Sequence, residues 1–310
     1  MRIDTTLTKN RTNRTNRTNR TNRTNHTNRT NRTKPHKPHK TAQNRTKPHK
    51  TMNFNNQAIC ITAGEQSENH AGMQINGDGL CQNGFTIYEL EEIQKTLGKK
   101  NIQSEYIRLD SFLEESDKEG AEPAGLLFIR NGVEELTGEK PDDFFKELLD
   151  FEWDKKYWDQ RRQKVLNKLA RYNVCFGEDE QNPDYENKKG TIVGYENVPI
   201  LQKWKNSLHD FFGEKANNLE VEGNLYYNTK KCGIGFHGDS ERKKVIACSL
   251  GETRPIHWQW YERSKPIGPR VEFVLNHGDM YIMSEKTTGF DWKKRSKKTL
   301  RHAAGEKYVK

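Results

Sequence analysis

The last third of the chain is a series of short runs rich in β-branched and aromatic residues, separated by glycine, proline and charged residues. The runs are NLYYN, KVIACSLG, IHWQWYE, VEFVLNHGDMYIM and TLRHAAG. Runs of this length bounded by turn residues predict strands of antiparallel sheets. Two helical segments precede them, so we expect an α+β fold in which a double-sheet jelly roll is backed by helices.

The first 51 residues cannot contribute to such a core. They consist of Asn-Arg-Thr and Lys-Pro-His triplets, typical of a translated nine-nucleotide repeat, with Met52 directly after them. They contain nine Arg and six Lys against a single acid, Asp4. Almost no apolar side chain offsets the entropy of ordering, so we expect residues 1–51 to be a disordered basic tail. The tail has a net charge of +14 and the whole chain one of +10, so residues 52–310 have a net charge of −4.

The rest of the chain divides into two parts where its amino-acid composition changes. Residues 52–84 are polar and rich in Gly and Asn, which indicates a loop, and Thr86 with Glu89 forms a capping box that opens a short helix. We therefore expect an N-terminal extension over residues 52–124, ending in an acidic linker. From residue 125 to 310 we expect the main domain, with a strand at GLLFI and helices that begin near Pro141 and Pro199.

Several classes of protein are disfavoured. The chain has no apolar run of about 20 residues that could span a membrane and no secretory signal. Its five cysteines are scattered and lack CxxC spacing, which favours reduced thiols over a disulfide framework or a zinc site. We expect a monomeric intracellular protein, in the cytoplasm or nucleus, that is neither secreted nor bound to a membrane.

His237 and Asp239 stand one residue apart, just before the apolar run KVIACSLG. On a strand, residues i and i+2 point to the same face, so an imidazole and a carboxylate can reach one metal. A second histidine from a distant strand would complete a two-histidine, one-carboxylate triad, whose open positions suit an oxygen-activating Fe(II). An ordinary polar turn is the competing interpretation.

The third ligand is open on local evidence. His302, in TLRHAAG, is flanked by small residues that leave room for a site, but it also suits a surface position near the C-terminus. His277 follows the pattern of a turn and His257 that of a strand packed among aromatic residues. His209 belongs to a helix and His70 to the polar N-terminal segment.

Five motifs in one order resemble the AlkB-like family of 2-oxoglutarate- and Fe(II)-dependent dioxygenases, including those of large DNA viruses. They are Asn-Leu-Tyr at 224–226, His-Gly-Asp-Ser-Glu at 237–241, Ser-Leu-Gly-x-x-Arg at 249–254, His-Gly-Asp-x-x-x-Met at 277–283, and a late histidine. The similarity covers residues 125–310. It implies a double-stranded β-helix and a reaction that consumes 2-oxoglutarate and O2 at Fe(II).

The resemblance also gives roles to matched residues. His237, Asp239 and His302 would be the catalytic iron ligands, and Asn224 and Tyr226 would contact 2-oxoglutarate. Glu241 and Arg254 match positions near the substrate in that family. From its neighbours alone, Glu241 equally suits a solvated acid paired with Arg242 or Lys243.

Two departures from the family pattern stand out. Lys293 and Lys294 follow Trp292, where some relatives have the distal histidine, and His302 comes later. The family usually has arginines after that histidine to bind the carboxylates of 2-oxoglutarate, whereas no arginine follows His302 here. Lys310 has the strand parity of His302, so we expect it to take that role.

The implied activity is oxidative demethylation of N-alkylated bases in nucleic acid, as in DNA repair. The substrate would be single-stranded or have its base flipped out. The segments 258–270 and 292–298 combine aromatic and basic residues that suit such a partner, although they equally suit a strand, a turn and a solvated charge run. The alternatives are a 2-oxoglutarate oxygenase acting on protein side chains or small molecules, and a catalytically inactive jelly roll that binds nucleic acid or protein.

Overall fold

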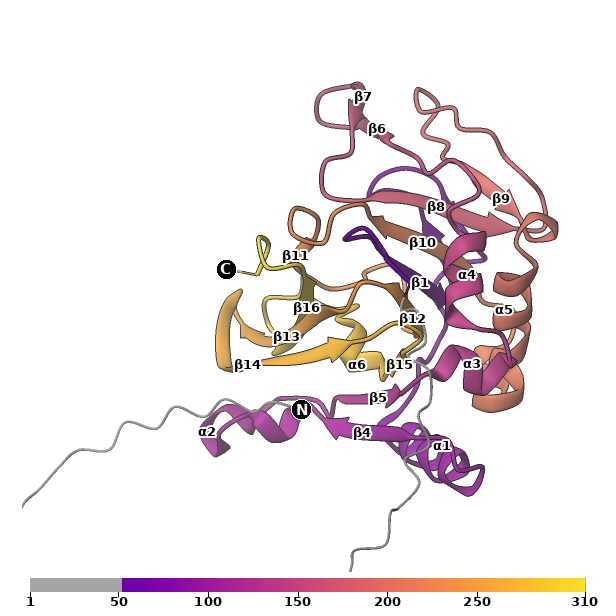
Figure 1. Cartoon of the computed structure of the whole chain (residues 1–310). Coiled ribbons are helices and arrows are strands. Elements are labelled where there is room, and N and C mark those ends of the chain that lie inside the picture. Colours follow the sequence, from indigo (N-terminus) through magenta and orange to yellow (C-terminus); the bar gives the residue numbers. More distant parts are fainter. Residues whose placement is uncertain (1–51, 310) are drawn as a thin grey trace, which may run out of the picture. The chain divides into compact units, whose positions relative to one another are not determined.

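The larger of two sheets has eight strands and forms the middle layer of the molecule (Figure 1). The computed structural model describes residues 52–309, which lie in one compact unit, Met52–Lys310. The tail over residues 1–51 and Lys310 lie outside the described residues. Among the paired strands of these described residues, only β8 and β9 run parallel. The strands, in sheet order, are β4 (Ser104–Arg108), β5 (Gly125–Ile129), β15 (Met280–Met283), β12 (Val245–Gly251), β1 (Ala58–Gly64), β10 (Glu220–Tyr226), β8 (Tyr172–Gly177) and β9 (Ile192–Gly194).

The smaller sheet has four antiparallel strands and lies against one face of the larger sheet. Two short hairpins add no strand to either sheet. In sheet order the four strands are β11 (Ile234–His237), β16 (Thr299–Ala304), β13 (Arg254–Glu262) and β14 (Lys265–Leu275). The hairpins pair β2 (Ser67–Glu68) with β3 (Ile75–Asn76) and β6 (Lys156–Asp159) with β7 (Lys164–Asn167).

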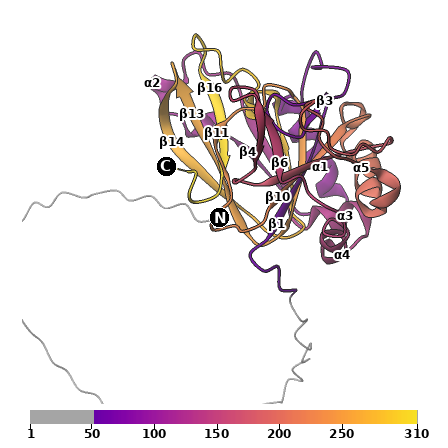
Figure 2. The ribbon, with the colours of Figure 1, turned by 90° about the horizontal axis from the view of Figure 1, so that it is seen from above.

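Helices cover the other face of the larger sheet (Figures 1 and 2). In the covering layer α5 is the longest helix and packs against α3 and α4, while α1 lies beside β4. This layer consists of α1 (Ile87–Lys99), α3 (Gly132–Thr137), α4 (Pro141–Glu147) and α5 (Pro199–Phe212). The short helices α2 (Glu115–Lys118) and α6 (Glu285–Thr288) lie outside it.

Strand β1 links two hydrophobic cores because its side chains alternate between the faces of the larger sheet. Ile59 and Ile61 belong to the core that includes the helices, and Ala58 and Cys60 belong to the core between the two sheets. β1 hydrogen-bonds to β10 on one side and to β12 on the other. All seven of its residues are buried, as expected of a strand covered on both faces.

Several predicted elements are confirmed. The Thr86 side chain accepts a hydrogen bond from the Glu89 N–H while the Thr86 N–H donates to Glu89, which is the predicted capping box of α1. GLLFI forms β5, and Pro199 occupies the first turn of α5. The buried face of α5 consists of Leu201, Trp204, Leu208 and Phe212.

The loop predicted over residues 52–84 is wrong for its central part. Residues 58–64 form β1, near the middle of the larger sheet, and residues 104–108 add β4 at its edge. The segment 52–124 is therefore built into the same compact unit as the residues after it. The acidic segment after β4 forms a short 3-10 turn and α2, anchored by the buried side chain of Leu113.

The α+β class agrees with the prediction: most strands are antiparallel, they form two facing sheets, and helices cover one side. None of the described helices is both long and apolar enough to cross a membrane.

Candidate metal centre

Two strands of the smaller sheet bring the predicted ligands together. His237 is the last residue of β11, and Asp239 follows it after a single glycine. His302 lies on β16, which pairs antiparallel with β11 so that His237 and His302 are direct partners. Directly opposed residues of a ladder have neighbouring side chains, and the two imidazole centroids are 4.4 Å apart.

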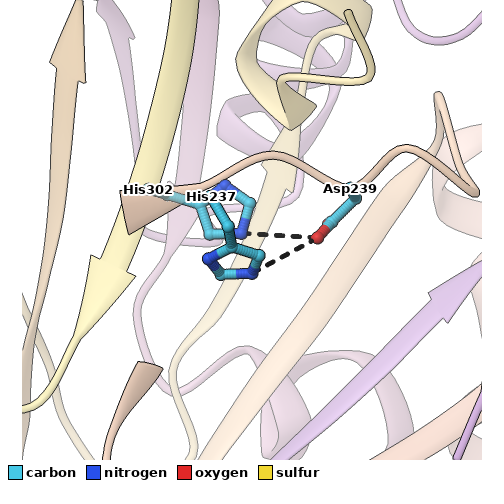
Figure 3. Close-up of side chains that lie close together, drawn as sticks. All are labelled: His237, Asp239 and His302. Carbon is cyan, nitrogen blue, oxygen red and sulfur yellow. Dashed lines mark ion pairs between the residues drawn. The ribbon is translucent and has the colours of Figure 1, made fainter. Parts of the chain in front are cut away.

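All three side chains converge on one point (Figure 3). The Nε2 atoms of His237 and His302 each lie 3.6 Å from the same carboxylate oxygen, Oδ1 of Asp239. The three donor atoms lie within 4.8 Å of one another. Two imidazole nitrogens and one carboxylate oxygen at this spacing can bind a single divalent cation.

The neighbouring backbone orients the His237 ring. Its Nδ1 lies 2.9 Å from the carbonyl oxygen of Gly235, which can only accept a hydrogen bond, so Nδ1 carries the proton. The lone pair of Nε2 therefore faces Asp239, as is usual for metal-binding histidines. For His302, Nδ1 is buried and has no hydrogen-bond partner among the described residues.

Burial sets the protonation of the three groups. It lowers the pKa of His237, although the Asp239 carboxylate opposes this shift. Burial lowers the pKa of His302 well below its usual value, and the charges of His237 and Arg242 add to the effect. The pKa of Asp239 is raised by burial, against the pull of Arg242 and His237. Both imidazoles are therefore neutral at pH 7, the form in which histidine binds metals.

Gly238, between two of the ligands, has no room for a side chain. A Cβ at this position would overlap the carbonyl oxygen of Gly289 and lie 2.8 Å from Cδ1 of Trp292. The Asp239 N–H also donates to the carbonyl oxygen of Thr288. The last residue of α6 and the glycine after it therefore hold the His-Gly-Asp turn in place by direct backbone contact.

We expect Gly238→Ala to separate these two segments. Overpacking of this kind costs about 1–3 kcal/mol of unfolding free energy, and the displaced carboxylate should weaken Mn²⁺ binding by about tenfold or more. Urea unfolding and calorimetric titration measure the two effects. Gly98→Ala is the control, because a Cβ on Gly98 in α1 meets no atom within 4 Å. Wild-type Mn²⁺ affinity in Gly238→Ala would contradict this account.

The three ligands open into a cavity of about 700 Å³ between the two sheets. The larger sheet contributes lining residues from β1, β10 and β15, and the smaller sheet contributes them from β11, β13 and β16. The segment around β2, including Glu68 and His70, forms another part of the wall. The cavity is thus bordered by the N-terminal segment that was expected to be a loop outside the main domain.

The structure brings most of the other predicted residues to this cavity. Asn224, Tyr226, Glu241 and Arg254 all line it. The side-chain oxygen of Asn224 accepts hydrogen bonds from Arg171 Nε and Asn173 Nδ2, both at 2.6 Å. Protein groups thus already occupy that oxygen.

The remaining histidines lie elsewhere or have other partners. His277 occupies the predicted turn, where its Nδ1 accepts from the Gly251 N–H and its Nε2 lies 3.1 Å from Asp142. His257 is buried on β13, 3.5 Å from Glu272. His70 lines the cavity and stacks on Tyr157 of β6, with centroids 3.8 Å apart. Lys293 also lines the cavity, but His302 completes the ligand set.

No family model matches the sequence. The chain is 42% identical over 255 residues to the uncharacterized protein R156 of Acanthamoeba polyphaga mimivirus. The match covers 82% of this chain and 98% of the viral protein. The chain belongs to the family of this mimivirus protein.

In this relative of the mimivirus protein, a buried network of ion pairs lies beside the three candidate metal ligands. Arg242 Nη2 lies 2.9 Å from both Glu222 and Glu241. Glu241 is therefore largely buried and not a solvated acid. Its partner is Arg242, one of the two basic neighbours that the sequence offered. The Glu222 carboxylate also accepts a hydrogen bond from the Glu68 N–H. Sequence reasoning missed Glu222 and Glu68, and the only local signal was the i, i+2 spacing of Glu222 and Asn224 on β10.

Glu68 gives this network a pH dependence. Burial raises the pKa of Glu68 to about 7, and the charges of Glu241 and Glu222 add to the shift, while the Gly72 N–H and Arg242 oppose it. Because the folded state favours the protonated acid, this contribution to stability is fully present below the ordinary pKa of 4.5 and is lost as pH rises through about 7.

We therefore expect Glu68→Gln to gain stability relative to the wild type as pH rises from 4.5 to 7, with no further gain above that range. Glutamine keeps an oxygen that can accept from the Gly72 N–H but cannot ionise. Urea unfolding of both proteins at pH 4.5 to 8 measures the difference. A difference that does not change with pH would show that Glu68 ionises normally in the folded protein.

Proposed function

We propose that the chain is an Fe(II)- and 2-oxoglutarate-dependent dioxygenase of the AlkB-like kind, built on a double-stranded β-helix. Its proposed reaction is the oxidative demethylation of N-alkylated bases in nucleic acid. The observation that carries the proposal is the convergence of His237, Asp239 and His302 inside a cavity between two facing sheets. The pairing of β11 with β16 supports it, because the register alone makes the two histidines neighbours.

The donor set suits a divalent metal that keeps open coordination positions. Two neutral imidazoles and one carboxylate carry a single negative charge in a buried place, which a divalent cation offsets. Three protein ligands leave positions for a co-substrate and O2, as in non-haem Fe(II) oxygenases. His237, Asp239 and His302 would hold the iron, and the iron with its co-substrate would supply the oxidising power for attack on a C–H bond.

The other residues that line the cavity are compatible with such a reaction. Tyr226 presents its ring beside Arg254, and Asn224 is held by Arg171 and Asn173. Buried walls from both sheets limit access of water to the ligands. In the balanced reaction, an N-methyl group, 2-oxoglutarate and O2 yield the N–H base, formaldehyde, succinate and CO2.

The rim of the cavity supports a nucleic-acid substrate. Trp292 and Lys293 line it, and the next two residues, Lys294 and Arg295, are exposed. The β6–β7 hairpin reaches the same cavity through the stacking of Tyr157 on His70. Aromatic rings can stack on unpaired bases and basic side chains can neutralise phosphates.

The test uses the full chain with Fe(II), 2-oxoglutarate and single-stranded DNA that carries N-methylated bases. Succinate and formaldehyde in equal amounts would support the proposal. Succinate formation that the DNA does not stimulate would point to an oxygenase for protein side chains or small molecules. Metal binding without any succinate would overturn the enzymatic proposal in favour of a binding module.

A further inference from the structure

Arg254 is a buried cation that no carboxylate of the described residues pairs with. It is the first residue of β13, is 5% exposed and lines the cavity. Its Nε and Nη1 have no hydrogen-bond partner among the described residues. Its Cζ lies 4.3 Å from the centroid of the Tyr226 ring, so one face of the guanidinium rests on an aromatic side chain.

An unpaired arginine is costly in such a place. The guanidinium stays charged at any physiological pH, and burial of a charge costs several kcal/mol unless an opposite charge or hydrogen bonds compensate it. Arg242, which lines the same cavity, has two carboxylates within 2.9 Å. Among the described residues, two acids neutralise Arg242 and none pairs with Arg254, which indicates an anionic ligand.

The strand register places Arg254 relative to the metal centre. On β13, Trp258 is directly opposite His302, and Ile256 is opposite Ala304. Arg254 shares their face of the strand because the side chains repeat every two residues. At about 3.3 Å per residue it lies about 13 Å along β13 from the position opposite His302.

The wall between these two points is apolar. Ile256 and Ala304 line the cavity between Arg254 and the histidines, and Ile234 of β11 pairs with Ala304 on the other side. An extended ligand that joins the two points would have an apolar middle, an anionic group at Arg254 and a metal-binding group at the other end.

We propose that Arg254 binds the distal carboxylate of a dicarboxylate 2-oxo acid whose 2-oxo acid end binds the metal centre. This assignment rests on the proposed function. From the sequence, we expect Lys310 to bind the carboxylate of 2-oxoglutarate and Arg254 to lie near the substrate. Our proposal instead assigns Arg254 to the carboxylate of the co-substrate. A planar guanidinium suits a bidentate pair with a carboxylate, and the methylene carbons rest on Ile256 and Ala304.

The test compares two 2-oxo acids that differ only at the distal end. The full chain, loaded with Mn²⁺ without O2, is titrated calorimetrically with 2-oxoglutarate and with 2-oxopentanoate, in which a methyl group replaces the distal carboxylate. The wild type should prefer 2-oxoglutarate by about 100-fold, the size expected for charged hydrogen bonds. Arg254→Met should lose this preference by binding 2-oxoglutarate more weakly while its affinity for 2-oxopentanoate stays the same, and Arg254→Lys should retain part of it.

Arg301→Met is the matched control. Arg301 rests on the ring of Tyr261 at 4.0 Å and also has a buried Nε without a partner among the described residues, but it does not line the cavity. This variant should keep the wild-type preference. Mn²⁺ affinity of each variant reports whether its metal centre is intact.

Three results would overturn the assignment, and they separate its failure from that of the proposed function. If Arg254→Met binds Mn²⁺ normally and keeps the preference, Arg254 is not the anchor and the oxygenase proposal stands. If the wild type binds both acids equally well, Arg254 is again not the anchor and the oxygenase proposal again stands. If the wild type binds Mn²⁺ but neither acid, the proposed function fails and the role of Arg254 fails with it.

Discussion

A chain with His302→Ala is expected to lose tight metal binding and, with it, the formation of succinate. The imidazole of His302 supplies one of only three donor atoms, and both remaining donors lie on the His-Gly-Asp turn. Loss of a residue that merely supports a ligand typically costs about 10–100-fold in metal affinity, so loss of the ligand itself should cost more than about 100-fold. Calorimetric titration with Mn²⁺ and an assay for succinate measure the two losses.

His257→Ala is the control for this variant. His257 is 5% exposed against 8% for His302 and lies on the adjacent strand, but it does not line the cavity. Truncation of either histidine removes a similar buried ring from the smaller sheet, and thermal unfolding reports that cost. Equal Mn²⁺ affinity in the two variants would show that His302 is not a ligand.

Lys286→Met is expected to lower the free energy of unfolding by about 3–5 kcal/mol, the usual cost of leaving one partner of a buried ion pair alone. Lys286 Nζ lies 2.8 Å from Asp291 Oδ2, and the two side chains are only 3% and 1% exposed. The second acid near Lys286, Glu122, is 3.5 Å away and about half exposed. Without the lysine, the carboxylate of Asp291 stays buried without a cation. Urea unfolding at pH 7 measures the loss.

The double variant Lys286→Met, Asp291→Leu separates the unpaired charge from other effects. It removes both charges, so it should be more stable than Lys286→Met alone. The pair also holds the segment that carries Gly289 and Trp292 against Gly238. The single variant should therefore bind Mn²⁺ more weakly. A loss of less than about 1 kcal/mol in the single variant would refute the assigned role of the pair.

Helix α5 and all strands after residue 220 except β11 follow from local signals in the sequence. Runs of β-branched and aromatic residues bounded by turn residues predicted the strands, and Pro199 marked the start of α5, whose buried residues Leu201, Trp204 and Leu208 follow helical spacing. The capping box at Thr86 also acts within a few residues. Each of these signals lies inside the element that it predicts, and all of these elements are present.

Strand β1 was missed because its place depends on distant residues. AICITAG is a short apolar run without periodicity, surrounded by polar residues, and a strand covered on both faces has this pattern. What makes it a strand is its pairing with β10 and β12, which lie far along the chain. Local composition cannot show such pairing.

The metal centre likewise contains ligands that the local sequence predicts and one that it leaves open. His237 and Asp239 could be predicted because only Gly238 separates them, although Asp239 lies on the turn after β11 and not on the strand face that the spacing suggested. His302 stayed open because Lys293, near the expected position, and several other histidines competed with it. The register of β11 against β16 favours His302, and a register between distant strands is not visible in the sequence. The missing partners of Arg254 are likewise a property of the folded chain alone.

The position of β1 has a consequence for how the chain is made. A ribosome completes residues 58–64 early, but Ile59 cannot pair until Leu225 and Leu250 have been synthesised. Folding dominated by such distant pairing is slow, and the unfinished sheet exposes strand edges meanwhile. A shortened chain that starts at residue 125 would keep all three metal ligands yet split the larger sheet between β12 and β10. Two open edges of that kind invite pairing between molecules, so such a fragment should aggregate.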